Sequence, residues 1–288
     1  MKPLHILFAV AVAVFWGTGF VVAKAAFDQF PPIMLMALRF AVAALVMVWF
    51  VEPPWHLMGR IFVVALVSAA AQYSLTFTGL KGLDASTAIV IVQLEMPFMV
   101  LLAAIFFKDI LGWRRLFGMI LALAGVGLIA GQPQLQQDWL PLLLVASGAF
   151  VWAVGQIMAK MLAAAGGITL IAWVAVFATP QLFVCSWLFE QGQIEALVAA
   201  DAVGWAQVLY LGVVMTVLAY AIWYHLLGRY DVNEVAPFLL LLPVVTVVAS
   251  VVLLGEQPTW PVVVGGIAAI TGVAVILTHR KPPAELPV

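Results

Sequence analysis

Hydrophobic residues run along the chain in long blocks, separated by short polar breaks or breaks that contain glycine and proline. Each block is long enough for an α-helix to cross the roughly 30 Å hydrocarbon layer of a bilayer, which takes about 20 residues. The pattern therefore predicts an all-α membrane protein with ten transmembrane helices. The predicted spans are residues 5–26, 32–50, 60–80, 85–107, 114–131, 139–162, 168–189, 203–227, 233–254 and 260–278.

Composition narrows the class of protein further. Of the 288 residues, 66% are hydrophobic and 9% are charged, whereas about a quarter of the residues are charged in a soluble domain. The net charge of −1 provides no basic surface, so we expect no nucleic-acid partner. The chain has one cysteine, and its four histidines lie far apart in sequence, so we expect no disulfide, no metal site and no cofactor.

The positive charges predict how the chain lies in the membrane. Cytoplasmic loops are enriched in Lys and Arg. The opposite side clearly holds only Lys81, and with the N-terminus inside, the cytoplasmic side holds Lys2, Arg60, Lys108, Arg114, Arg115, Arg229, Arg280 and Lys281. We therefore expect both termini in the cytoplasm. The first apolar run, from Leu4 to about Ala23, is longer than the core of a signal peptide and is interpreted as the first span.

The second half of the chain repeats the first. WGTGFVVAK at Trp16–Lys24 matches WAVGQIMAK at Trp152–Lys160, at an offset of 136 residues. An offset of 147 residues pairs Tyr73 with Tyr220, Asp84 with Asp231, Asp109 with Glu256, Gly118 with Gly265, and Gly125 with Gly272. Each unit, residues 1–131 and 132–288, holds five spans, and this odd number predicts that the second unit is inserted upside down. Inverted repeats are an architecture of secondary transporters, with the substrate site between the units near mid-membrane.

Several segments resemble a known family. The end of each unit, at Leu253–Leu277 and Phe106–Ile129, and the segments WGTGFVVAKAAF and LRFAVAALVMVWF are similar to an EamA repeat. The resemblance covers nearly the whole chain and points to the EamA-like ten-helix family of the drug/metabolite transporter superfamily. It implies a multi-pass protein of a bacterial-type inner (plasma) membrane that exports amino acids or related metabolites. Asp109 stands where the family usually has a glutamate, as at Glu256, and this acidic position looks structural.

The fourth span carries the most unusual polar residues, Gln93 and Glu95, near its centre. A carboxylate at mid-membrane costs at least about 2.5–3.5 kcal/mol, so Glu95 must face protein or a wet cavity. We interpret it as a protonatable site or a counter-charge for a substrate amine. The alternative is a neutral carboxyl that is hydrogen-bonded to a neighbouring helix. In a regular helix the two side chains lie about 200° apart, so at most one points squarely into a central cavity.

Aromatic and hydroxyl residues of paired spans complete the predicted substrate site. Trp16 and Trp152 are repeat partners that lie mid-span, where an interfacial tryptophan belt does not explain them. Cavity lining is favoured over simple packing, because glycines beside Trp16 permit close approach. The third and eighth spans add Tyr73, Thr76, Thr216 and Tyr220. Hydroxyls in membrane helices also bond back to their own turn, so the threonines alone are weak indicators.

Three further groups of residues are interpreted as structural and not as part of the substrate site. Arg39 lies inside the second span, and fixing the fold is favoured over attracting a carboxylate. Asp84 and Asp231 precede helices and are predicted to cap them. The glycines of the fifth and tenth spans predict a closely packed scaffold pair outside the pathway, and an oligomer contact is left open.

The leading hypothesis is a secondary transporter, not an enzyme, that exports amino acids or similar small metabolites by alternating access. The chain lacks a GxxxxGK[ST] loop for ATP. Its expected partners are the lipid bilayer and a small-molecule substrate, with protons as a candidate coupling ion. The alternatives are a proton-coupled multidrug extruder and, in another class, an intramembrane enzyme.

Overall fold

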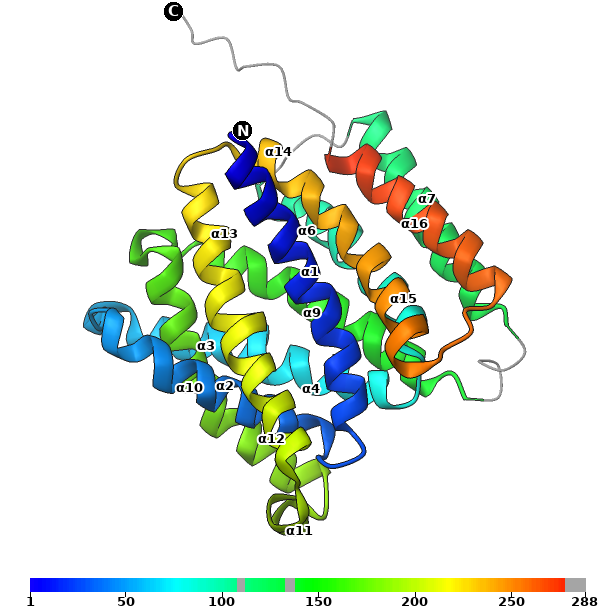
Figure 1. Ribbon diagram of the computed structural model, residues 1–288. Coiled ribbons are helices and arrows are strands. Elements are labelled where there is room, and N and C mark those ends of the chain that lie inside the picture. Colours follow the sequence, from blue (N-terminus) through cyan, green and yellow to red (C-terminus); the bar gives the residue numbers. More distant parts are fainter. Residues whose placement is uncertain (108–111, 133–137, 278–288) are drawn as a thin grey trace, which may run out of the picture.

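The computed structural model describes residues 1–107, 112–132 and 138–277, and this part of the chain forms helices and no β-strand (Figure 1). Ten helical segments in it are long and apolar enough to cross a membrane. The predicted all-α class and the ten spans are therefore confirmed. The spans are Pro3–Ala26, Pro32–Phe50, Trp55–Lys81, Ala85–Phe106, Trp113–Ala130, Leu140–Lys160, Gly167–Phe189, Ala202–Leu227, Ala236–Leu254 and Trp260–Leu277.

Several spans consist of more than one helical element. The first five comprise α1 (Pro3–Ala26), α2 (Pro32–Met47) with η1 (Val48–Phe50), η2 (Trp55–Leu57) with α3 (Met58–Ala65), η3 (Leu66–Ala71) and α4 (Gln72–Lys81), α5 (Ala85–Val92) with α6 (Glu95–Phe107), and α7 (Trp113–Ala130). The last five comprise α9 (Leu140–Lys160), α10 (Gly167–Phe189), α12 (Ala202–Leu209) with η5 (Tyr210–Leu218) and α13 (Ala219–Leu227), η6 (Ala236–Leu240) with α15 (Leu241–Leu254), and α16 (Trp260–Leu277). Shorter helices connect them, namely η4 (Ala163–Ala165), α11 (Gln193–Ala199) and α14 (Val232–Val235).

The third and eighth spans each contain a π-helix, in which the backbone hydrogen bonds reach one residue further than in an α-helix. The 147-residue offset places η3 on residues 213–218, inside η5, so the two π-helices occupy matching positions. Thr216 follows the same wide spacing, because its hydroxyl donates to the carbonyl of Leu211, five residues earlier, at 2.8 Å. Such π-turns are frequent at functional sites.

The fourth and ninth spans are interrupted. The chain turns at Gln93–Leu94 between α5 and α6, and a 3₁₀ segment precedes α15 in the ninth span. Prolines account for both interruptions: Pro97 lacks the N–H that would bond to the carbonyl of Gln93, and Pro243 lacks the one for Leu239. Discontinuous helices frequently form the substrate sites of transporters.

The first span of each unit packs against the third span of the other unit. α1 contacts η5 and α13, and α9 contacts η3 and α4. Glycines permit both approaches, because Met215 of η5 occupies the space beside Gly19 and Ser68 of η3 occupies the space beside Gly155. Gly19 and Gly155 are repeat partners at the first offset, and Ser68 and Met215 are partners at the second. The same contact thus occurs twice with the units exchanged, which fits two structurally related units.

α7 and α16 pack closely against each other at one side of the bundle (Figure 1). A side chain at Gly118 would strike the carbonyl of Gly272, and one at Gly125 would strike the carbonyl of Gly265. The reversed order of these partners shows that the two helices run antiparallel. The small residues therefore serve close helix packing within the chain.

Two glutamates of the second unit cap helices of the first unit. Glu256 accepts hydrogen bonds from the backbone N–H groups of Ala85 (2.6 Å) and Ser86 (3.0 Å), and from the Ser86 hydroxyl (2.7 Å), at the start of α5. Glu190 accepts the backbone N–H groups of residues 33 and 34 at 2.7 and 3.0 Å, at the start of α2. The expected structural role of Glu256 is thus explained by geometry. Asp109, its counterpart, lies outside the described residues.

The prediction that Asp84 caps α5 is wrong. Its side chain makes no capping hydrogen bond, because Glu256 occupies the N-terminus of this helix instead. Partial burial raises the pKa of Asp84, the Glu256 carboxylate raises this pKa further, and the positive charge of Lys24 lowers it. Asp84 is therefore a neighbour of the cap and not part of it.

Candidate functional site

Arg39 lies inside the bundle, near the middle of the second span, and only 1% of its surface is exposed. Its Nε donates to the hydroxyl of Thr216 at 2.8 Å. Its Nη2 lies 3.4 Å from the hydroxyl of Tyr73, and the guanidinium carbon lies 4.9 Å from the centre of the Tyr73 ring. These contacts join α2 to α4 in its own unit and to η5 in the other, which supports the favoured structural role.

Aromatic side chains contact one another at two places in this part of the bundle. The indole N–H of Trp16 donates to the carbonyl of Met215 at 3.1 Å, and its ring centre lies 5.2 Å from that of Tyr220 and 5.7 Å from that of Trp223. Tyr73 stacks on Phe77 with ring centres 5.5 Å apart. The structure therefore brings Trp16 and Tyr220 into direct contact.

Glu95 begins α6, directly after the turn at Gln93–Leu94. The side chain is half-buried, and its carboxyl has no hydrogen-bond or ion-pair partner among residues 1–107, 112–132 and 138–277. The neighbouring helix partner that the structural alternative requires is thus absent from the described chain. The 200° angle expected between Gln93 and Glu95 also does not apply, because the helix is broken between them.

The side chain of Tyr220 lies within electrostatic range of Tyr73, Arg39 and Glu95. We define the central cluster as Trp16, Arg39, Tyr73, Glu95, Thr216 and Tyr220. It combines one cation, one acid, three hydroxyls and aromatic faces inside the bundle, which is the composition of a site for a small polar molecule.

Three predicted site residues lie outside this cluster. Thr76 is buried beside Gly148 and accepts a hydrogen bond from the side-chain nitrogen of Gln72 at 3.0 Å. Trp152 packs in a separate apolar group beside α6. Gln93 is half-buried at the end of α5. The structure thus groups five of the eight predicted site residues and adds Arg39.

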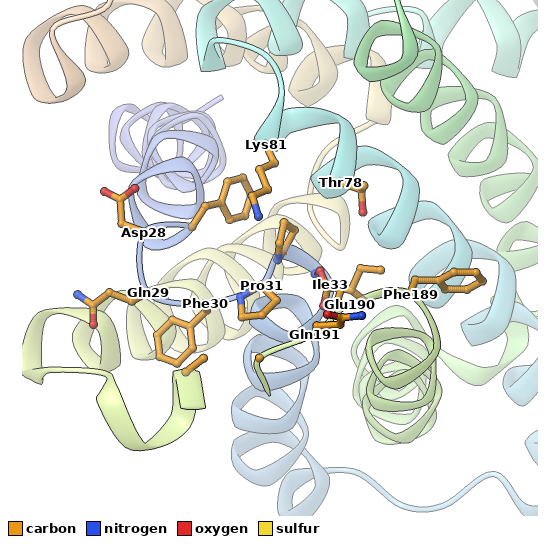
Figure 2. A pocket seen from close by; sticks show the side chains of 14 residues that line it. Asp28, Gln29, Phe30, Pro31, Ile33, Thr78, Lys81, Phe189, Glu190 and Gln191 are labelled. Carbon is orange, nitrogen blue, oxygen red and sulfur yellow. The ribbon is translucent and has the colours of Figure 1, made fainter. Parts of the chain in front are cut away.

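A pocket of about 450 Å³ opens at the end of the bundle where α1 ends and α2 begins, opposite the N-terminus (Figures 1 and 2). Ile33 from α2 and Thr78 from α4 are among its walls, and Figure 2 shows Lys81 pointing into it. Arg39 lies six residues further along α2 than Ile33, about 9 Å at the α-helical rise. Tyr73 lies five residues before Thr78 in α4. The two helices that contribute Ile33 and Thr78 to the pocket therefore also carry residues of the central cluster.

Sequence reasoning did not place Arg39 in the central cluster and did not locate the pocket. Arg39 was visible as a charge within a span, but its distant partners Thr216 and Tyr73 were not. Glu190 was visible only as one acid of a long connecting segment, because its partners are backbone groups 157 residues away. Contacts that join the two units leave no local pattern in the sequence.

Ten helices that are long and apolar enough to cross a membrane, with a polar cluster between two related units, are typical of a multi-pass membrane transport protein. Residues 3–131 and 139–278 each match the EamA-like transporter family. The chain belongs to this family. The expected resemblance is confirmed, and the family indicates a transporter.

Relatives of known name agree with this class. The chain is 32% identical over 274 residues to a probable amino-acid metabolite efflux pump of Escherichia coli, covering 92% of this chain and 91% of the relative. It is 27% identical to a probable terminal-alkyne amino-acid exporter of Streptantibioticus cattleyicolor, covering 67% and 64%. A crystal structure that is 20% identical superposes with a TM-score of 0.66 over 96% of both chains and shows the same fold.

Proposed function

We propose that this protein exports amino acids or related small metabolites as a secondary transporter that works by alternating access. The observation that carries the proposal is the Glu95 carboxyl, which lies half-buried at a helix break without a partner in the described chain. A buried carboxyl is unfavourable unless something pairs with it. A substrate ammonium group or a proton supplies that partner during transport.

The arrangement of the two units supports the alternating-access part of the proposal. Breaks and π-helices occur at matching positions of both units, so each unit can bend at the same depth. A pocket opens at the end of the bundle where α1 ends and α2 begins, which gives a substrate a place to enter from that side. Trp16, Tyr73, Thr216 and Tyr220 then contact the substrate, while Gln93, Thr76 and Trp152 line its path in other conformations.

Counterflow in proteoliposomes tests this function. Vesicles that contain the purified protein are loaded with one unlabelled amino acid each, and uptake of the same labelled amino acid is followed over time. We expect saturable counterflow for a subset of amino acids, and a large loss of it in Glu95→Gln. Absence of counterflow for the whole panel, with correctly inserted protein, would refute the proposal.

A multidrug extruder is the second candidate, because the aromatic contact of Trp16, Tyr220 and Trp223 beside an acid also suits apolar cations. Competition separates the two. If ethidium blocks counterflow at lower concentration than unlabelled amino acids do, the multidrug function is favoured. A pH gradient that drives uptake in the wild type and not in Glu95→Gln would identify protons as the coupling ion.

A further inference from the structure

The buried guanidinium of Arg39 makes fewer short hydrogen bonds than its N–H donors allow. A guanidinium carries five N–H donors. Here Nε makes one short hydrogen bond, to Thr216, while Nη2 and Nη1 have only long contacts of 3.4 Å to Tyr73 and 3.8 Å to the sulfur of Met36. No carboxylate within the described ranges forms an ion pair with it. The Nη groups therefore have no strong acceptor among the described residues.

A single buried cation without a counter-ion is costly in a membrane. Contact with the ring of Tyr73 offsets part of the cost, since an aromatic face attracts a cation. The unpaired acid of the same region, Glu95, does not pair with Arg39. Both groups lie within electrostatic range of Tyr220.

We propose that Arg39, oriented by Thr216 and Tyr73, binds the carboxylate of the substrate, while Glu95 binds its ammonium group. The site is then selective for zwitterions, molecules that carry both charges at once. A guanidinium binds a carboxylate through two parallel N–H bonds, a geometry that its Nη groups can offer. This inference rests on the proposed function and names the charge pattern of its substrate.

Selectivity follows from the cost of leaving one charge unpaired. A zwitterion pairs with both Arg39 and Glu95. An analogue of the substrate without the carboxylate leaves the guanidinium of Arg39 unpaired. An analogue without the ammonium group leaves the carboxylate of Glu95 unpaired. Sites built to pair with a polar group reject analogues without it strongly. A purely structural Arg39, holding α2 against η5, predicts no such discrimination.

Competition in the wild-type protein tests the inference without any variant. For the labelled amino acid with the largest counterflow, the competitors are the unlabelled amino acid, its decarboxylated amine and its deaminated acid. For phenylalanine these are phenethylamine and 3-phenylpropionate. We expect half-inhibition by the amino acid at a concentration at least tenfold lower than by either fragment. Equal inhibition by the amino acid and its amine would overturn the role of Arg39.

Variants of Arg39 and Glu95 test which charge of the substrate each residue binds. Arg39→Gln should weaken inhibition by the amino acid at least tenfold while inhibition by the amine changes less than threefold. Glu95→Gln should weaken inhibition by the amino acid and spare inhibition by the acid. Arg60→Gln, at an exposed arginine of α3, is the matched control and should change neither. These effects are read from binding of the labelled amino acid to purified protein in detergent.

If Arg39→Gln weakens inhibition by the amino acid and inhibition by the amine equally, Arg39 has a structural role only and the inference is overturned. If Arg39→Gln does not fold, Tyr73→Phe provides the test, because it removes only the hydroxyl near Nη2. This variant should still weaken inhibition by the amino acid more than inhibition by the amine. Absence of counterflow for every amino acid would instead refute the proposed function, so the two failures are distinguishable.

Discussion

The cap that joins the two units gives a sharp test of the structure. Glu256→Ala removes three hydrogen bonds to the start of α5, at 2.6, 3.0 and 2.7 Å. Loss of an N-terminal cap costs about 0.5–2 kcal/mol, and a hydrogen bond to a charged group is worth about 1.5–3 kcal/mol. Because the three bonds share one carboxylate and are not additive, we expect a loss of about 2–4 kcal/mol in the free energy of unfolding. In a chain of this size this lowers Tm by about 5–10 °C.

The assay is thermal unfolding in detergent, followed by tryptophan fluorescence. Glu256→Gln keeps one acceptor oxygen, so its Tm should fall less than that of Glu256→Ala. Asp84→Asn is the matched control, because Asp84 lies beside the same helix start without bonding to it. The raised pKa of Asp84 means that its ionised form disfavours folding. Asp84→Asn should therefore leave Tm unchanged or slightly higher at pH 7, and any gain should shrink as the pH falls towards 4.

The reasoning would be refuted by a Glu256→Ala protein with the Tm of the wild type. A drop in Asp84→Asn as large as that in Glu256→Ala would refute it as well, because it would return the cap to Asp84.

Three further predictions concern the pathway, the scaffold and the orientation. Trp16→Ala should weaken substrate binding more than it lowers Tm, since a ligand loses an aromatic wall; normal affinity in correctly inserted protein would exclude Trp16 from the site. Gly125→Leu should abolish stable protein in the membrane, because a side chain there meets the backbone of α16, whereas Gly127→Leu, which faces open space, should be tolerated; equal yields of the two variants would contradict the packing. In a Cys-free background, cysteines at Lys81 and Arg229 should react with impermeant reagents from opposite sides of the membrane, and labelling from one side would exclude the predicted topology.

Much of the fold could be predicted from the sequence, because the bilayer sets a length that a helix must meet. Span ends such as Ala26 and Phe189 follow directly from where apolar runs stop. The repeat offsets also anticipated which positions match, including the glycines of α7 and α16. These signals are local or periodic, and a sequence displays them fully.

The site could be predicted only in part. Glu95 and Trp16 stood out because their residue types are costly or unusual at their depth. The roles of Arg39 and Glu256 depend on partners in the other unit, more than 170 residues away for Thr216 and Ala85. Asp84 illustrates the same limit: a good capping residue stood in the right place, and a distant glutamate took the position. Local propensity cannot reveal such competition.

The two π-helices differ in length, six residues in η3 and nine in η5. Matching segments of two related units therefore hold different shapes at the same moment. If each unit can adopt the shape of the other, exchanging the two shapes moves the opening from one face of the membrane to the other. Such an exchange restores nearly the same set of contacts, so the two states would have similar free energies. A ligand with a small difference in affinity for the two states is then enough to shift their populations. We expect the longer π-helix to lie in the third span whenever the pocket is closed.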